Sequence, residues 1–185
     1  MKPYFYLVSM LTIGLAGCHT IRPGATPTNA LISDVPSLDR NVALIMDADY
    51  TGFISKDRGN PLADPQKFMI GAALGPLTEA YFGKAARTLK TYPTMDQAKV
   101  EGGADLYVHP RVSSFDNTLR LGGQRVDIVL ASDIYDKDLK LIQTVEGRSM
   151  GTGETSTKSA NNTVSTALQM ALIDLIKNIQ DSLNP

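Results

Sequence analysis

The residue with the clearest covalent chemistry is Cys18, the single cysteine of the 185-residue chain. It follows a basic start at Lys2, an apolar run from Tyr4 to Leu15 and two small residues. A positive start, an apolar core and a small-residue cleavage site are typical of a secretory signal peptide. The run is shorter than the roughly 20 residues that a helix needs to span a bilayer. We therefore predict that residues 1–17 are removed, which leaves the Cys18 thiol at the new N-terminus.

The sequence Leu15-Ala16-Gly17-Cys18 resembles the lipobox of bacterial lipoproteins. The resemblance implies a diacylglyceryl thioether on the Cys18 sulfur and a further acyl chain, such as palmitate, on the freed amine. At about 0.8 kcal/mol per buried methylene, two or three chains hold a domain on a membrane stably. Residue 19 is His19 and not the aspartate that retains enterobacterial lipoproteins at the inner membrane, so the resemblance favours the outer membrane. The alternative is that Cys18 is a small apolar residue of an ordinary signal peptide or membrane anchor.

No other group of residues predicts catalysis. His19 lies in a polar segment, and His109 precedes a proline in an expected strand, where a lone imidazole is more often structural or exposed than catalytic. A serine hydrolase would need His109 as its base, and we expect no Gly-x-Ser-x-Gly nucleophile elbow to supply the serine. The glycine-rich residues 147–153 lack the Lys-Ser or Lys-Thr of a phosphate-binding loop.

Two groups of aspartates could in principle bind a hard cation: Asp47 with Asp49, and Asp133 with Asp136 and Asp138. These spacings fall in expected turns, where aspartate is common, so we interpret them as solvated turn carboxylates. A histidine metal site would need companion ligands that the sequence lacks. We therefore predict no metal, no cofactor and no catalytic residues, and expect that the protein is not an enzyme.

The composition limits the partners. Without Lys2, one of 18 basic residues, the chain keeps 19 acidic residues and a formal charge of −2, so we expect no binding to nucleic acid. With Cys18 acylated, no thiol remains for a disulfide or a thiolate metal site. The hydrophobic content of 43% is enough for one core, and the length fits one domain.

Residues 18–37 are rich in Thr, Pro, Gly, Ala and Asn and lack apolar periodicity. They are predicted to form a lipidated N-terminus and a flexible tether, which would hold residues 38–185 on the order of 25 Å from the membrane. Residues 38–185 are expected to begin with a buried strand (42–46) and a short strand or loop (50–54). A helix from Asp64-Pro65 to Leu89, kinked or broken near Gly75-Pro76, should follow, and after the helix-breaking Tyr92-Pro93 a short helix (95–100). The last expected elements are a strand (104–112) that ends or lies at an edge at Pro110, a hairpin (126–145) followed by the glycine-rich residues 147–153, and a C-terminal amphipathic helix capped by Asn161 or Asn162.

This order of elements resembles the small periplasmic lipoproteins, most closely the YajG type, with more distant similarity in layout to LpoB, PelC and the periplasmic domain of CsgG. The resemblance implies a sheet with helices on one face, used as an accessory or assembly domain in the outer envelope. Cys18 is the one family residue that carries over. The chain has no tryptophan, so the tryptophan-based features of relatives such as PelC have no counterpart.

We therefore expect an α+β single domain with a mixed or antiparallel sheet and helices packed on one face, including a long C-terminal amphipathic helix. The predicted function is that of an outer-membrane lipoprotein, anchored through Cys18 and facing the periplasm. It would act through contacts with an envelope protein or through self-association, in envelope assembly, maintenance or export. One alternative is a lipid- or glycan-binding protein with an apolar cleft walled by Tyr81, Phe82 and Tyr107. Another is an envelope hydrolase that uses His109.

Overall fold

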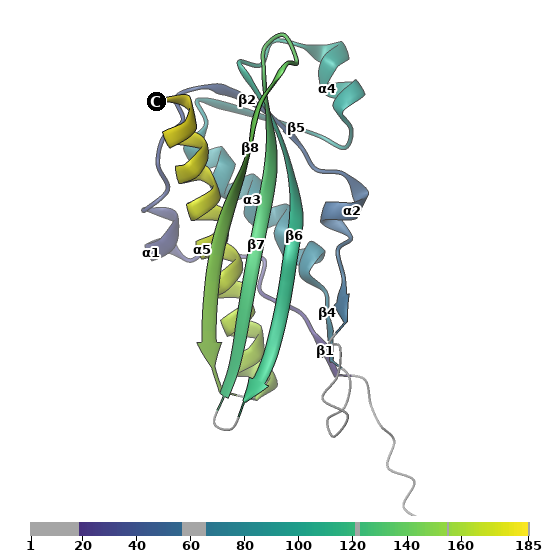
Figure 1. Cartoon of the computed structure of the whole chain (residues 1–185), viewed down its shortest axis with the longest axis vertical. Helices are drawn as coiled ribbons and strands as arrows, with labels where there is room; N and C mark the ends of the chain where they lie inside the picture. The colour runs from purple at the N-terminus through teal and green to yellow at the C-terminus, as the bar shows by residue number, and fades with distance from the viewer. Residues whose placement is uncertain (1–18, 57–65, 121–122, 155, 185) are drawn as a thin grey trace, which may run out of the picture.

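A mixed five-stranded sheet is the frame of the fold (Figure 1). Its strand order is β5-β2-β6-β7-β8, with β2 at Asn41–Ile45, β5 at Thr88–Tyr92, β6 at Leu106–Arg120, β7 at Gly123–Asp136 and β8 at Leu141–Gly153. Strands β5, β2 and β6 pair in parallel, whereas β6, β7 and β8 form an antiparallel meander. The computed structural model describes residues 19–56, 66–120, 123–154 and 156–184, and it confirms the predicted single α+β domain.

The buried strand predicted at residues 42–46 is β2, an interior strand between β5 and β6. Val42 and Leu44 face the main core, while Ala43 and Ile45 face a smaller cluster on the other side of the sheet. All four side chains are at most 2% exposed. A continuous apolar run is therefore explained by burial on both faces.

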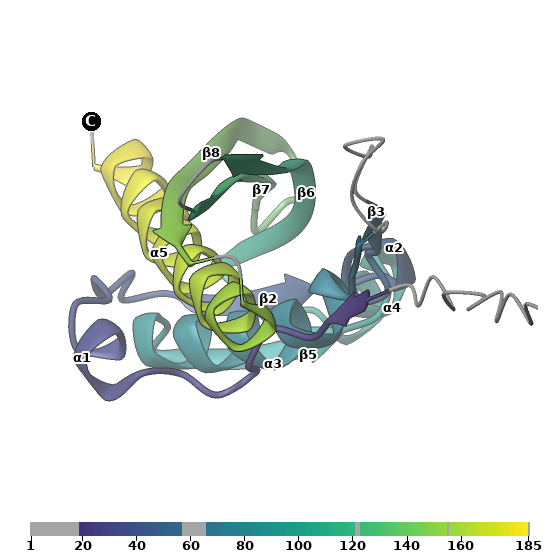
Figure 2. The same cartoon turned by 90° about the horizontal axis from the view of Figure 1, so that it is seen from below.

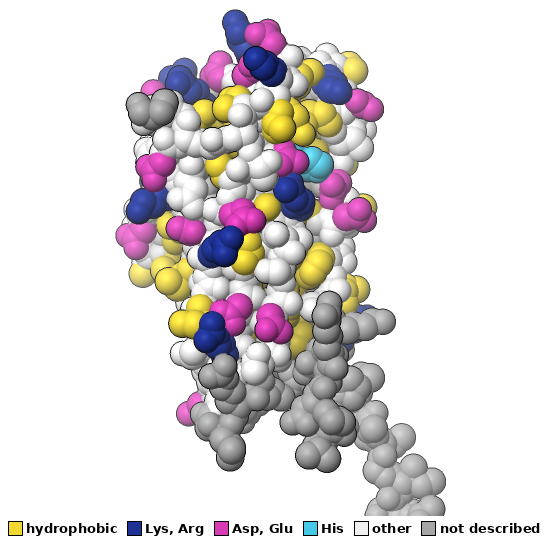
Figure 3. Space-filling model, in the orientation of Figure 1, with side chains coloured by type: hydrophobic (Ala, Val, Ile, Leu, Met, Phe, Trp, Pro, Cys, Tyr) yellow, Lys and Arg dark blue, Asp and Glu magenta, His cyan; other side chains and the backbone are white. Residues whose placement is uncertain are grey.

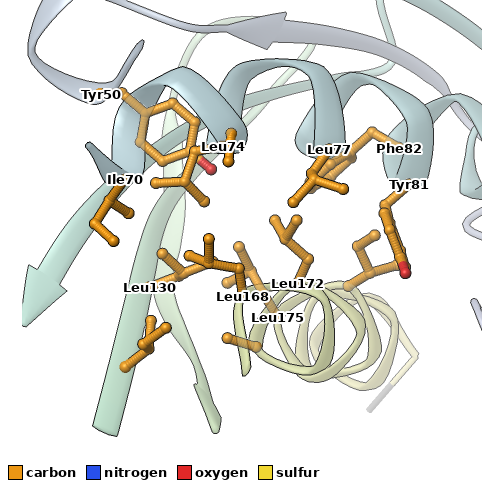
Figure 4. Close-up of a cluster of buried hydrophobic side chains, with 14 of the residues drawn as sticks. Tyr50, Ile70, Leu74, Leu77, Tyr81, Phe82, Leu130, Leu168, Leu172 and Leu175 are labelled. Atoms are coloured by element: carbon orange, nitrogen blue, oxygen red, sulfur yellow. The ribbon is translucent and has the colours of Figure 1, made fainter. Parts of the chain in front are cut away.

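Two helices, α3 (Ile70–Ala85) and α5 (Thr157–Leu183), enclose the main core with one face of the sheet (Figure 2). Leu74 and Leu77 of α3 point toward Leu168 and Leu172 of α5 (Figure 4), and all four are fully buried. Burial of each such side chain stabilises the fold by about 1.5–3 kcal/mol. The apolar stripe of the C-terminal helix therefore belongs to the core, as predicted.

A shorter helix, α4 (Met95–Glu101), packs on the opposite face of the sheet, where Ala98 contacts the cluster of Ala43, Ile45 and Tyr107. Thr94 caps its N-terminus by accepting a hydrogen bond from the Gln97 amide. Gly102 and Gly103 follow with φ of 60° and 82°, a conformation that favours glycine, and end the helix.

The expected tether is the largest departure from prediction in the N-terminal part. Residues 19–21 form β1 (His19–Ile21), which pairs in parallel with β4 (Gln66–Phe68) in a small second sheet. That sheet is completed by β3 (Ser55–Lys56), and a short helix, α1 (Asn29–Ile32), follows β1 in the chain. The segment 19–37 is therefore part of the folded domain.

Two apolar residues explain why this segment folds against the domain. Ile21 is 1% exposed and Val35 is 9% exposed, and both belong to the main core. The residues between them are mostly polar or proline, and the apolar Ala25, Leu31 and Ile32 are only partly buried. No periodic pattern therefore marks the buried positions in the sequence.

The segment between β2 and α4 also differs from prediction. Residues 48–51 form a helical turn, α2 (Ala48–Thr51), instead of a strand or loop, because the Asp47 side chain caps it. Helix α3 begins after Met69, and the predicted start at Asp64-Pro65 lies outside the described residues. The helix is continuous through Pro76 and ends at Ala85, and Leu89 lies in strand β5.

Pro110 does not end its strand, since β6 continues to Arg120. The pairing of β6 with β2 stops at Val108, however, so β6 has an open edge on that side at Pro110. A proline is tolerated there because no strand on that side needs its missing N–H. The prediction of an edge position is therefore correct, and the prediction of a strand end is wrong.

The glycine-rich residues 147–153 are not a turn but the second half of β8. A Cβ at Gly147 would lie 2.3 Å from the carbonyl oxygen of Ala171, and one at Gly153 would lie 2.1 Å from Thr163 Oγ1. The glycines therefore let α5 approach the strand closely. The helix itself begins at Thr157, capped by Ser156 and not by Asn161 or Asn162.

Candidate functional site

Cys18, the predicted acylation site, lies outside the described residues and directly precedes β1. No helix among the described residues combines the length and the apolar character that crossing a membrane requires. Acylation of Cys18 therefore remains a prediction from the sequence.

The described part of the chain contains a charged pocket of about 260 Å³ beside β6, just beyond the point where its pairing with β2 stops. It lies where α2 meets β6, on the side where β6 has lost its neighbour β2. The lining residues are Asp47, Asp49, Tyr50, Phe53, His109, Arg111, Val112 and Asp133. Figure 3 shows acidic, basic and histidine side chains together on this face of the molecule.

The topology explains why a pocket forms at this point. Strand β2 ends at Ile45, and the chain turns away from the sheet into α2. From His109 onward, β6 therefore has an unpaired side, and we call the space beside it the notch. The register of β6 against β7 then shifts between Val112 and Ser114, which marks a bulge at the far side of the notch. Ligand sites in open sheets commonly lie beyond the carboxyl ends of parallel strands, and bulges commonly accompany functional sites.

Asp47 and His109 form the central pair of the pocket. His109 Nε2 lies 2.8 Å from Asp47 Oδ2, while Asp47 Oδ1 accepts a hydrogen bond of 2.8 Å from the Tyr50 amide. Partial burial alone would raise the pKa of Asp47, but the hydrogen bonds from His109 and Tyr50 outweigh it and hold that pKa below its usual value. Asp47 therefore stays ionised while it both caps α2 and orients the imidazole.

Arg111 and Asp133 form a second pair on the same sheet face. Arg111 Nη1 lies 2.9 Å from Asp133 Oδ2, and Thr144 Oγ1 donates a 2.6 Å hydrogen bond to Asp133 Oδ1. Partial burial would raise the pKa of Asp133, but the bonds from Thr144 and Arg111 lower it overall. In the β6–β7 register Asp133 lies directly opposite His109, so the two pairs are neighbours.

Aromatic residues close the inner wall. Tyr50 is 2% exposed and its hydroxyl lies 2.6 Å from Thr78 Oγ1 of α3, in a buried hydrogen bond. Burial raises the pKa of Tyr50, so its hydroxyl stays neutral. Phe53 is half-buried beside it. The inner wall of the pocket is therefore aromatic and largely buried, and its rim is charged.

The lining combines three carboxylates with one guanidinium and one imidazole. This excess of acid favours a cationic group as the occupant. The lining includes no serine, threonine or cysteine, so the Asp47–His109 pair has no nucleophile beside it there. Among the described residues, no three His, Cys, Asp or Glu side chains are grouped so that they could hold a metal ion.

The expectation that the chain has no Gly-x-Ser-x-Gly pattern is wrong. The pattern occurs once, as Gly147-Arg148-Ser149-Met150-Gly151. These residues lie within strand β8 and not at a turn between a strand and a helix. Ser149 Oγ is buried without a hydrogen-bond partner in the structure. The segment packs against α5 through its glycines, so it does not present an exposed serine.

The structure brings together residues that the sequence treated separately. His109 is not a lone imidazole, because it pairs with Asp47. Asp47 is only partly exposed and holds two hydrogen bonds, so it is more than a solvated turn carboxylate. The expectation that His109 is structural and not catalytic stays a prediction. Asp133 also lies in the pocket, whereas Asp136 is the last residue of β7 and accepts hydrogen bonds from the amides of Asp138 and Lys140 in the turn that follows.

The proposed cleft wall of Tyr81, Phe82 and Tyr107 does not exist. Tyr81 and Phe82 are fully buried in the main core, and Tyr107 lies in the cluster on the other face of the sheet. The Tyr81 hydroxyl donates a 2.8 Å hydrogen bond to Gln169 Oε1 of α5, and burial raises the pKa of Tyr81 to about 12. These aromatics stabilise the fold and line no cleft.

A mixed sheet covered by one long C-terminal helix and a shorter central helix defines the structural class. No family model and no curated protein matches the chain. Protein XCC0632 from Xanthomonas campestris, of family DUF330, shares this fold with 11% identity and a TM-score of 0.57 over 90% of this chain and 98% of that chain. Protein CT253 from Chlamydia trachomatis also shares the fold, with 8% sequence identity and a TM-score of 0.53. That match covers 78% of this chain and 98% of CT253.

A weaker similarity, with a TM-score of 0.45 and 12% identity, joins 76% of this chain to 91% of a PelC variant from Paraburkholderia phytofirmans, which forms a dodecamer. Several lipoproteins are among the more distant structural neighbours. The resemblance to the YajG type, which the order of elements in the sequence suggested, stays a prediction.

Proposed function

We propose that this protein is an outer-membrane lipoprotein, acylated on Cys18, whose domain faces the periplasm and acts without catalysis through contacts with an envelope protein. The observation that carries the proposal is the lipobox-like sequence at residues 15–18, placed at the end of an apolar run and directly before the folded domain. Roles in envelope assembly, maintenance or export all fit this arrangement.

The charged pocket supports the contact part of the proposal. Its volume of about 260 Å³ is below the roughly 300–1,000 Å³ of sites for drug-sized ligands. One long cationic side chain, lysine or arginine, would fill it and meet Asp47, Asp49 and Asp133. The aliphatic stem of that side chain would pack against Phe53.

A photo-crosslinking amino acid at Phe53 tests the contact in cells. We expect it to capture one discrete envelope protein, and we expect the same amino acid at Lys137, an exposed residue of the β7–β8 turn, not to capture it. Adding Asp49→Lys should abolish capture, because a fixed ammonium would occupy the pocket. Equal capture from both positions, or capture that survives Asp49→Lys, would contradict the proposed contact.

Binding of a small polar ligand is the second candidate, and the polar rim of the same pocket is the observation that favours it. The lipid-binding form of this alternative loses its basis, because its proposed wall residues are in the core. Native mass spectrometry of the purified domain separates the two functions. A retained small molecule that is lost in Arg111→Ala favours ligand binding, whereas a bare protein mass favours the protein contact.

A further inference from the structure

The chain is attached to the folded domain from its first described residues onward. Strand β1 pairs with β4 in the register His19 to Gln66 and Ile21 to Phe68. The Met69 amide donates a 3.0 Å hydrogen bond to the Ile21 carbonyl, and the Ile21 side chain is 1% exposed. The chain is therefore held in place three residues after Cys18.

The residues that follow continue to contact α5. The Arg22 amide donates to Asn161 Oδ1 at 3.1 Å, and Ser165 Oγ donates to the Gly24 carbonyl at 3.0 Å. Farther along, the Thr28 amide donates to Gln169 Oε1 at 2.7 Å. These hydrogen bonds run along α5 from its start toward its middle. Residues 22–28 are therefore held against the domain and cannot extend the link to Cys18.

We infer that the anchor holds one end of the domain directly against the membrane surface, with a link of three residues instead of a long tether. At about 3.5 Å per extended residue, Cys18 lies within about 10 Å of Ile21. A free segment of residues 18–37 would allow on the order of 25 Å. This inference rests on the proposed function, because it requires acylation of Cys18.

The fold identifies which end meets the lipid. Strand β1, the start of α5 and the ends of β6 and β7 at Arg120 and Gly123 lie at one end of the molecule (Figure 1). The β7–β8 turn, α4 and the end of α5 lie at the opposite end. The first group therefore faces the bilayer, and the second group faces the periplasm.

This orientation also places the charged pocket. His109 lies eleven residues from Arg120 along β6, which corresponds to about 35 Å at the rise of a strand. The pocket is thus held well above the membrane surface, where a protein partner in the periplasm can reach it.

Fluorescence quenching on vesicles tests the orientation. The acylated protein would be extracted in detergent and placed in phosphatidylethanolamine and phosphatidylglycerol vesicles that contain headgroup spin-labelled lipid. Cys18 is the only native cysteine and carries the lipid, so a thiol-reactive dye labels only an introduced cysteine. The two sites are Glu154→Cys, between β8 and α5, and Lys137→Cys, in the β7–β8 turn; both positions are exposed. We expect several-fold stronger quenching at residue 154.

A variant with a Gly-Ser spacer of about 20 residues between Cys18 and His19 is the matched control. It should stay acylated and vesicle-bound while the quenching at residue 154 drops toward that at residue 137. Equal quenching at both sites, or quenching unaffected by the spacer, would overturn the short link while leaving acylation intact. A protein that carries no acyl chain and does not bind the vesicles would overturn the proposed function as well.

Discussion

Asp47 and His109 lie 62 residues apart in the chain, and their side chains meet at 2.8 Å in the charged pocket. Asp47 ends the connection that leaves β2, and His109 is the first residue of β6 beyond the pairing with that strand. One carboxylate therefore joins the start of α2 to the open edge of β6. The pair is the structural centre of the pocket and the origin of several expected effects.

Asp47→Ala should lower the free energy of unfolding by about 1–2 kcal/mol, because it removes the cap of α2 as well as the partner of His109. Asp47→Asn should cost less, since asparagine caps a helix about as well as aspartate. Urea unfolding at pH 7 measures both. Asp49→Ala is the control, as this exposed neighbour should change stability by no more than about 0.5 kcal/mol. Equal losses for alanine at both positions would contradict the role of Asp47.

Stability should fall in acid because the pKa values of Asp47 and Asp133 are lower in the folded chain than their usual values. Such carboxyls stabilise the fold above the unfolded pKa of about 3.9, and this contribution is lost as pH falls through the lower folded pKa. We expect a nearly constant urea midpoint down to about pH 5 and a decline below about pH 4. The double variant Asp47→Asn with Asp133→Asn should show a shallower decline. The same slope in both proteins would show that other carboxyls dominate.

Gly147→Ala should destabilise the domain by about 1–3 kcal/mol or more. The added methyl group would lie 2.3 Å from the Ala171 carbonyl oxygen and 2.4 Å from the Leu175 amide nitrogen, and both are backbone atoms of α5. Gly83→Ala is the matched control: it lies in α3, its Cβ would meet only Leu89 Cδ2 at 3.8 Å, and it should raise stability by about 0.5–1 kcal/mol. Thermal unfolding compares the two. A harmless alanine at residue 147 would mean that α5 does not pack this closely.

Two side chains of α5 cover part of the free edge of β8. Asp174 accepts a 2.8 Å hydrogen bond from the Arg148 amide, and Asn178 donates a 2.7 Å bond to the Glu146 carbonyl. Uncovered strand edges promote pairing between chains.

Asp174→Ala with Asn178→Ala should therefore increase association at equal concentration, as measured by light scattering after gel filtration. Asp181→Ala, an exposed position on the same helix, should leave the mass unchanged. A double variant with the same mass as the unaltered protein would contradict edge protection.

The sequence predicts the elements whose burial is continuous or periodic. Strand β2 follows from an unbroken apolar run, the β7–β8 hairpin from alternation around Asp136, and α5 from apolar residues every three or four positions. Strand β5 was missed because only Leu89 and Tyr92 of its five residues are apolar, as suits an edge strand. The packed segment 19–37 was missed because its buried residues are isolated.

The charged pocket could not be predicted because it depends on where two strands stop pairing. Asp47, His109 and Asp133 come from three separate segments, and only the register joins them. A weak local signal exists, since His109 and Arg111 alternate with the apolar Val108 and Val112 along β6. That alternation places a histidine and an arginine on one sheet face, but it does not reveal their acidic partners.

Lipid anchoring through Cys18 is tested most directly by the intact mass of the mature protein isolated from the bacterial envelope. We predict a chain that begins at Cys18 and carries a diacylglyceryl group with a further acyl chain. Cys18→Ser should lose both the added mass and the membrane association. A mature chain with an unmodified Cys18 in the soluble fraction would contradict this prediction.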